Sequence, residues 1–341
     1  MTANQYHPEG ELFTTQENRD YVSSIHGLEK AMASGKIIEG VARMCESADM
    51  SLNIELCGGN VMGIIPRSEA LFNSDGSDAK DIAIITRVGK AVCFKVKEII
   101  YPDKTDGSPT PVAILSRRDA QIECASFFHA RLNCGDIIPA VVTHLEPFGA
   151  FVDIGCGLVS LLSVDCISVS RISHPGDRIS VRDKIMVIVK SHDRETGRIY
   201  VSQRELLGTW EENVSGLRAG QTVAGIIRSI EEYGIFVELA PNLAGLAELC
   251  GEESGEMSRI APGQTCAVYI KSILPERMKI KLVLIDACKR EVSGERQSSV
   301  QKSKVKYFID TSSVKHIDKW QYSPENCKKV IETNFTLCEV T

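Results

Sequence analysis

The sequence predicts an all-β protein of tandem five-stranded barrels joined by short helical linkers. The first observation behind this prediction is a repeat, because PFGAFVDIG at 147–155 returns as EYGIFVELA 85 positions later. The second is the alternation of apolar and polar residues along short segments, which has the period of two that strands show. The third is that turn-rich sequence separates these segments. A repeat of this length, made mostly of short strands, indicates tandem β-domains.

Length and composition set the broad class of the protein. A chain of 341 residues usually folds as two to four domains. The formal net charge of −6 argues against a histone-like protein that binds nucleic acid by overall charge, although local basic patches remain compatible with RNA. The twelve cysteines show no CxxC spacing, so we expect free thiols and neither a metal site nor a cofactor. No apolar run is long enough to cross a membrane, and the first residues lack signal-peptide features, so we expect a cytoplasmic protein.

The N-terminal part predicts a mobile arm over 1–32 that leads into a short helix. A first barrel-like unit with its linker helix is expected over 33–132, with alternating strands up to Leu56 and the helix over 116–132. This unit is degenerate, because Met50 and Asn53 stand where the later units carry aromatic rings. It is therefore expected to be structural or to bind protein.

Two units that carry the aromatic repeat follow, over 133–216 and 217–288, the first of these with its own linker. Each shows about five strands in some seventy residues with one longer central connection, which matches a five-stranded Greek-key barrel of the OB type. The remainder, 289–341, begins as a basic linker. It then regains aromatic residues, so it is expected to dock on the third barrel or to form a small cap.

The aromatic residues of the repeat point to a function. Strand alternation places Phe151 and Asp153 on a wet face opposite the aliphatic residues, and Phe236 and Glu238 take the same places in the next unit. A further ring, Phe148 or Tyr233, lies three positions earlier in each unit. One interpretation is a platform on which nucleic-acid bases stack. The other is a second layer of core or a contact between barrels.

Cations lie near the predicted rings. In GRIYVS the alternation puts Arg198 and Tyr200 on the outward face, and in KIKL it puts Lys279 and Lys281 there. Cations hold phosphates while bases stack on rings, so this combination favours weak, sequence-tolerant binding of single strands. The alternative for each cation is an ordinary solvated strand face.

A family resemblance rests on longer stretches of sequence. GDIIPAVVTHLEPFGAFVDIG, then GLVSLL, HPGD and KIMVIVKSHDRETGRIYVS, resembles the RNA-binding repeat of the bacterial small-subunit ribosomal protein S-one family. The third unit looks like the same repeat, and the first is similar but degenerate. The chain thus resembles a short form of this family with about three repeats.

The resemblance implies a set of RNA-binding residues. In the second unit these are the rings Phe148 and Phe151 with Asp193 and Arg198, while Ser160 replaces the family's histidine. His174 in SHPGD matches a His-Pro of the family, although it could equally cap a turn, and Asp193 could shape the turn DRETGR.

In the third unit, Tyr233, Phe236 and Lys279 match the family's pattern. Glu248 takes the histidine position and Leu274 the aspartate position. The departures at these two positions predict that the second barrel dominates RNA binding.

These observations predict a non-enzymatic protein that binds single-stranded RNA. No P-loop, GxSxG, HExxH or dinucleotide-binding fingerprint is present, and the repeats leave no room for a catalytic domain. The resemblance implies mRNA and the small ribosomal subunit as partners, with neither a membrane nor a small-molecule substrate. Two alternatives stay open: a free-standing RNA-binding regulator of mRNA stability or translation, and a protein-interaction scaffold whose rings are buried between barrels.

Overall fold

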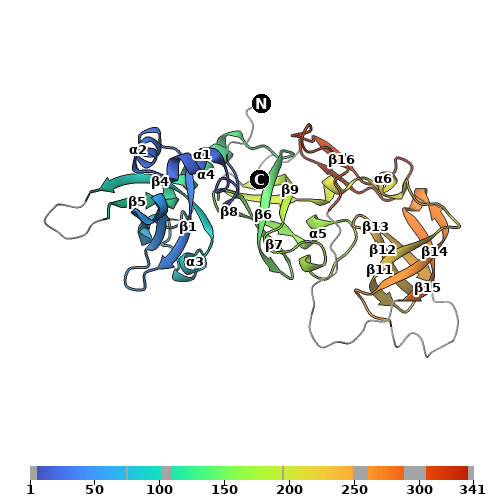
Figure 1. Cartoon of the computed structure of the whole chain (residues 1–341). Coiled ribbons are helices and arrows are strands. Elements are labelled where there is room, and N and C mark those ends of the chain that lie inside the picture. Colours follow the sequence, from blue (N-terminus) through green and yellow to red (C-terminus); the bar gives the residue numbers. More distant parts are fainter. Residues whose placement is uncertain are drawn as a thin grey trace.

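The fold was analysed on a computed structural model that describes residues 6–73, 76–101, 110–193, 196–248, 260–287 and 305–336. Three closed five-stranded barrels follow one another along the chain, with the first at the left and the third at the right of Figure 1. The predicted fold class is confirmed. Within the described ranges, no helix has the length and apolar character needed to span a bilayer.

The first barrel has the strand order β1-β2-β3-β5-β4, and β3 and β5 run parallel while the other pairs are antiparallel. Its strands are β1 (Ile38–Cys45), β2 (Leu52–Leu56), β3 (Val61–Ile65), β4 (Ala91–Ile100) and β5 (Val112–Ser116). Short helices accompany them: α1 (Gln16–Val22), α2 (Ile25–Ser34), η1 (Cys57–Gly59), η2 (Arg67–Glu69) and α3 (Asp81–Ile85). Alternate residues of β2 are buried, so the period-two pattern of the sequence marks the core face.

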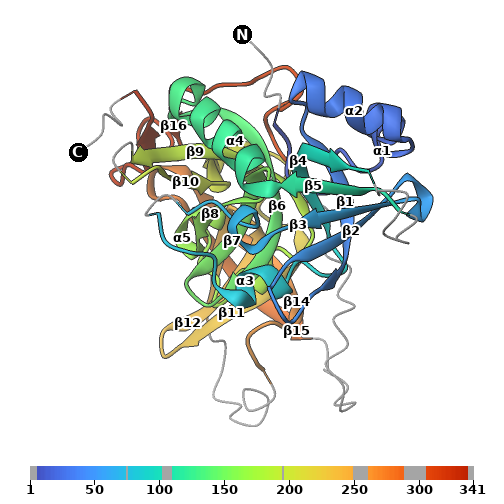
Figure 2. The same cartoon turned by 90° about the vertical axis from the view of Figure 1, so that its left-hand side faces the viewer.

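The second barrel repeats this topology, with the order β10-β8-β7-β6-β9 and a parallel contact between β8 and β10. Its strands are β6 (Ile137–Glu146), β7 (Gly149–Gly155), β8 (Leu158–Ser163), β9 (Lys184–Asp193) and β10 (Arg198–Ser202). The connections carry α5 (Val164–Ile167), η3 (Pro175–Asp177), η4 (Arg204–Leu207) and α6 (Trp210–Val214). The linker helix expected over 116–132 is confirmed as α4 (Arg117–Arg131), which lies across the first and second barrels in Figure 2.

The third barrel closes in the order β11-β12-β13-β15-β14. Its strands are β11 (Thr222–Glu231), β12 (Gly234–Ala240), β13 (Leu243–Glu248), β14 (Thr265–Leu274) and β15 (Lys279–Ala287), and η6 (Pro275–Arg277) joins the last two. All three barrels thus contain the same arrangement of five strands. The first barrel keeps this arrangement although its aromatic positions have diverged.

The N-terminal segment is ordered, so the prediction of a mobile arm is wrong from Tyr6 onward. Tyr6 is buried, and its hydroxyl donates to Glu123 of α4 at 2.8 Å. The backbone N–H groups of Gly10 and Phe13 donate to the carboxylate of Glu39, at 3.0 and 2.7 Å. These are contacts with residues distant in the sequence, so the polar composition of the segment does not reveal them.

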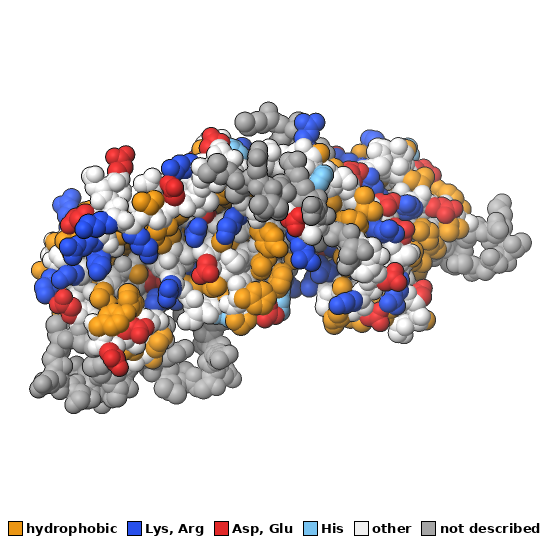
Figure 3. All heavy atoms as spheres, turned by 180° about the vertical axis from the view of Figure 1, so that it is seen from behind, with side chains coloured by type: hydrophobic (Ala, Val, Ile, Leu, Met, Phe, Trp, Pro, Cys, Tyr) orange, Lys and Arg blue, Asp and Glu red, His pale blue; other side chains and the backbone are white. Residues whose placement is uncertain are grey.

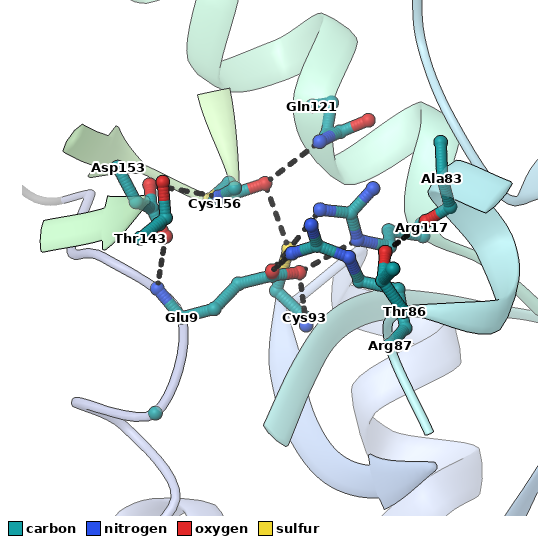
Figure 4. Close-up of polar contacts among 12 residues, drawn as sticks. Glu9, Ala83, Thr86, Arg87, Cys93, Arg117, Gln121, Thr143, Asp153 and Cys156 are labelled. Carbon is teal, nitrogen blue, oxygen red and sulfur yellow. Dashed lines mark hydrogen bonds and ion pairs between the residues drawn. The ribbon is translucent and has the colours of Figure 1, made fainter. Parts of the chain in front are cut away.

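A buried polar cluster holds this segment between the first two barrels (Figure 4). Arg117 of α4 binds Glu9 through two nitrogens, at 2.6 and 3.0 Å, and both side chains are almost fully buried. The backbone N–H of Glu9 donates to Asp153 of β7 at 2.8 Å, and Glu9 accepts from the N–H of Cys93 of β4 at 3.2 Å. Burial alone would raise the pKa of Glu9, but Arg117, Arg87 and the N–H of Cys93 together hold this pKa below its usual value. The cluster therefore joins four segments of the chain around Glu9, through ion pairs and backbone hydrogen bonds.

A pH dependence follows from Glu39 in the same region. Burial raises the pKa of Glu39 to about 7 from its usual value of 4.5, although the N–H groups of Gly10 and Phe13 act against the shift. Between these two values the folded protein binds more protons than the unfolded chain, so the free energy of unfolding falls as the pH rises from about 4.5 to 7. A shift of this size corresponds to about 3 kcal/mol.

We therefore expect Glu39→Gln to remove most of this loss, measured as the urea midpoint by circular dichroism between pH 5 and 8. Glu55→Gln, on exposed β2 surface, is the matched control and should keep the wild-type pH dependence. An unchanged pH profile in Glu39→Gln would contradict the assignment.

The C-terminal segment binds both the second and the third barrel. It contains a small sheet of β16 (Lys319–Gln321) and β17 (Glu332–Asn334), which lies above the junction of the two barrels in Figure 1. Trp320 and Tyr322 are buried in the core cluster of the third barrel, and Phe335 packs in a cluster with Ile137 and Ile188 of the second. The expected docking on the third barrel is therefore accompanied by docking on the second. The basic linker predicted from residue 289 lies largely outside the described residues.

One glycine permits this close contact. The carbonyl of Gly135 accepts a hydrogen bond from the N–H of Ile317 at 3.0 Å, and Gly135 has a φ of +93°. A Cβ atom at this position would lie 2.3 Å from the carbonyl oxygen of Ile317. Any other residue would therefore strain the backbone and displace the C-terminal segment.

Candidate nucleic-acid interface

The second barrel presents two aromatic rings at the hairpin between β6 and β7. Phe148 lies in the turn with 56% of its surface exposed, and Phe151 lies half-buried on β7. Their centroids are 6.0 Å apart, and the ring planes meet at 87°. Such an edge-to-face pair is a favourable aromatic geometry, and it leaves ring surface available to solvent.

The third barrel carries the same arrangement. Tyr233, which is 66% exposed, and Phe236 have centroids 6.1 Å apart and planes at 89°. A glycine follows the first ring in each barrel because the hairpin passes close to the next strand. A Cβ atom at Gly149 or Gly234 would lie 2.6 or 2.7 Å from a carbonyl oxygen of that strand. The motif aromatic-Gly-x-Phe therefore fixes the ring pair through local backbone geometry.

His144 joins the ring pair of the second barrel, although the motif itself does not single it out. Its ring lies 6.5 Å from that of Phe151 at an interplanar angle of 21°, and its Nε2 is 2.8 Å from Glu146 Oε1. The hairpin register pairs residue 144 with residue 151 across β6 and β7. A short turn at 147–148 would have predicted this pairing from the sequence.

The neighbouring strands continue the same face. Phe151 pairs with Leu161 of β8, and Leu161 pairs with Tyr200 of β10, so the half-buried Tyr200 lies two strands from the ring pair. Arg198 is exposed at the start of β10 and lies opposite Asp193 in the register. Its described surroundings provide no acidic side chain within ion-pair distance.

Two residues of the second barrel have structural contacts. Asp193 accepts hydrogen bonds from the backbone N–H and the hydroxyl of Thr196, at 3.1 and 2.5 Å, so it shapes the turn before β10. Ser160 is buried, and its hydroxyl donates to the carbonyl of Ile199 at 2.5 Å. Ser160 therefore joins β8 to β10 by a hydrogen bond, and it provides no aromatic ring on which a base could stack.

His174 has a structural contact within its own turn. Its Nδ1 accepts the backbone N–H of Gly176 at 2.9 Å, so it caps the η3 turn, as one of the two sequence interpretations proposed. The residues that follow contact the third barrel, where Asp177 lies 3.5 Å from Arg228, and Arg178 forms an ion pair with Glu238. The structure thus places His174 near the junction of the second and third barrels.

The face of the third barrel differs in its charges. Phe236 pairs with Leu246, and Leu246 pairs with Lys281, so Lys281 takes the place that Tyr200 has in the second barrel. Glu248 lies 3.1 Å from Lys271 and 3.7 Å from Lys281. The hydrogen bond from Lys271 holds the pKa of Glu248 below its usual value, so this carboxylate stays ionised beside the rings. Lys279 is exposed at the start of β15.

The carboxylates of the repeat are not on a wet surface, which corrects part of the sequence argument. Asp153 follows Phe151 by two positions but is 3% exposed, because it binds the N-terminal segment. Glu238 follows Phe236 in the same way and is 5% exposed, because it pairs with Arg178 and with Arg228. On β7 and β12 this strand face is therefore partly exposed at the phenylalanine. It is buried at the carboxylate two residues later, where the preceding part of the chain packs against it.

The first barrel has no ring pair at the corresponding positions. Met50 packs against the core and Asn53 is half-buried, while Arg43 and Glu55 form an exposed ion pair at 3.2 Å.

Side chains of Lys and Arg gather over the third barrel and where the first and second barrels meet, as seen from behind in Figure 3. The ring pairs thus rank the second and third barrels above the first as candidate binding surfaces.

Comparisons with known proteins agree with this geometry. Residues 131–204 match the family described as S1 RNA binding domain, which covers the second barrel. "Small ribosomal subunit protein bS1" of Staphylococcus aureus (strain COL) is 32% identical over 177 residues, which cover 50% of this chain and 45% of that protein. The protein of the same name from Staphylococcus haemolyticus (strain JCSC1435) is 32% identical over 204 residues, covering 57% of this chain and 50% of that protein.

Solved structures give partial likenesses. The solution structure of GSP13 from Bacillus subtilis is 27% identical and covers 22% of this chain and 57% of that one, with a TM-score of 0.21. The chain spans about half the length of the curated relatives it matches. The second barrel thus matches the S1 RNA binding domain, and the chain is similar to bS1 proteins over about half of its length.

Proposed function

We propose that the protein binds single-stranded RNA, without catalysis, through the ring pairs of its second and third barrels. The observation that carries the proposal is the recurrence of one edge-to-face ring pair at equivalent hairpins, at 6.0 and 6.1 Å. Bases stack on exposed rings without regard to sequence, and nearby cations hold the phosphates. Partial exposure of all four rings also favours this function over a scaffold whose rings are buried between barrels.

We further propose that the RNA is mRNA and that the protein acts in translation. The support is its similarity to proteins named as components of the small ribosomal subunit, over about half of their length. Co-sedimentation with purified small subunits distinguishes this role from that of a free-standing regulator. A ribosomal protein should sediment with the subunits at physiological salt, whereas a free-standing regulator should remain in the supernatant.

The proposed function is tested by fluorescence anisotropy of a labelled single-stranded RNA titrated with the wild-type protein. We expect saturable binding that weakens as salt rises, with a slope that counts the phosphate contacts. A duplex of the same sequence should compete poorly, since its bases are already stacked on one another. Absence of binding at low salt would overturn the proposal.

The third barrel provides a prediction about charge. Glu248→Gln removes the carboxylate that pairs with Lys271 and Lys281, so both lysines become available to phosphates. We expect RNA affinity to rise about threefold, with a steeper salt dependence. Glu276→Gln, an exposed carboxylate in η6, is the matched control for the change in net charge. Equal gains in the two variants would show that only the overall charge matters.

A further inference from the structure

A groove of about 900 Å³ extends from the ring pair of the second barrel to the first barrel. Three parts of the chain line it: the segment 71–73 that follows η2, the exposed side of α4 at Ser126 and His129, and the second barrel. Its volume lies near the upper end of the roughly 300–1,000 Å³ found for cavities that hold small ligands. The groove therefore has room for nucleotide-sized groups.

The charge of the groove fits a phosphate-bearing ligand. None of its described lining residues is Asp or Glu, although the whole chain contains 45 of them and has a net charge of −6. The lining contributes Arg198 and two histidines, His129 and His192, whose rings meet edge-on at 5.6 Å. In an acidic protein, a groove whose described lining holds an arginine and no carboxylate suits RNA better than it suits a basic partner.

The walls of the groove are fixed to one another by buried side chains. Gln121 of α4 accepts the backbone N–H of Phe72 at 2.9 Å and donates to the carbonyl of Cys156 at 3.1 Å. Arg117 donates to the carbonyl of Ala70 at 3.1 Å. A ligand would thus meet a preformed surface, which lowers the entropy lost on binding.

The groove is continuous with the proposed stacking surface. Phe151 belongs to the ring pair and also lines the groove, and Tyr200 lines it two strands away. Arg198 lies at the same side of the barrel, where it can reach a phosphate. A strand whose bases stack on Phe148 and Phe151 can therefore continue along the groove towards α4.

We propose that this groove holds the next nucleotides of the RNA, so that the first barrel, α4 and the second barrel act as one binding unit. The inference rests on the proposed function and assigns the first barrel a part in it. That barrel lacks a ring pair, but its segment 71–73 forms one wall of the path. A longer RNA should therefore gain affinity from contacts beyond the ring pair.

The test places a carboxylate in the groove of the full chain. Ser126→Glu introduces a charge on the exposed side of α4 that lines the groove, and Ala130→Glu puts the same charge one turn further along, outside the lining. Anisotropy is measured with labelled single-stranded RNAs of about four and about twelve nucleotides. We expect Ser126→Glu to weaken binding of the longer RNA about tenfold, and Ala130→Glu less than about twofold.

The outcomes separate the groove from the proposed function itself. Equal affinities of Ser126→Glu and Ala130→Glu for the longer RNA, with wild-type binding intact, would contradict RNA binding in the groove. The proposed binding at the ring pairs would be unaffected by that result. Absence of binding by the wild type would overturn both. Circular dichroism checks that each variant is folded. Val159→Glu, at a 54% exposed position of β8 that lines the groove, replaces Ser126→Glu should that variant unfold.

Discussion

Replacing Phe148 and Phe151 together by alanine is expected to weaken binding of single-stranded RNA by about 100-fold. Stacking of a base on an aromatic ring contributes roughly 1–3 kcal/mol, so the loss of two rings removes about 3 kcal/mol when each contributes about 1.5 kcal/mol. Neither ring is fully buried, and Phe148 is 56% exposed, so the barrel should remain folded. The measurement is fluorescence anisotropy at fixed salt, with thermal unfolding of the variant as a check on the fold.

The matched control is the equivalent pair in the third barrel. Tyr233→Ala with Phe236→Ala removes rings of the same geometry, yet we expect a loss of less than about tenfold. The reason is Glu248, which is ionised beside those rings and pairs with Lys281, the residue in the place of Tyr200. A larger loss from the third barrel would reverse the predicted ranking. No loss from either double variant, in folded proteins, would exclude the stacking platform.

The largest effect on stability is expected at the buried ion pair between the first two barrels. Arg117→Met leaves the carboxylate of Glu9 buried, with only Arg87 at 3.4 Å as a described cation within ion-pair distance. Removing one partner of a buried ion pair typically costs about 3–5 kcal/mol, because the remaining charge is uncompensated. We expect a loss of this size in the free energy of unfolding, measured by urea denaturation.

Two further variants are controls for the loss of stability in Arg117→Met. Arg118→Met, the exposed neighbour on α4, should change the free energy of unfolding by less than about 0.5 kcal/mol. The double variant Glu9→Met with Arg117→Met removes both charges, so it should be more stable than Arg117→Met alone. An Arg117→Met protein as stable as the wild type would show that the cluster does not hold the barrels together.

The sequence predicted the barrels and their ring pairs because both depend on short-range patterns. Alternation over five to ten residues identifies the core face of a strand, and a tight hairpin fixes which residues lie opposite each other. The motif aromatic-Gly-x-Phe therefore predicts the neighbouring rings of Phe148 and Phe151. His144 could have been found in the same way, by counting back across the turn from Phe151.

The contacts between units were decided by the tertiary structure alone. Glu9 and Arg117 are separated by 108 positions, and no local periodicity links them, so the polar composition of the N-terminal segment predicts a mobile arm. For the same reason strand alternation predicts Asp153 and Glu238 on a wet face, whereas each is buried where a neighbouring part of the chain docks. The amino-acid sequence by itself determined three barrels and the rings on their hairpins. Only the folded chain decided that α4 and the segment 71–73 extend the face of the second barrel into a groove, because such a surface forms only when distant segments pack together.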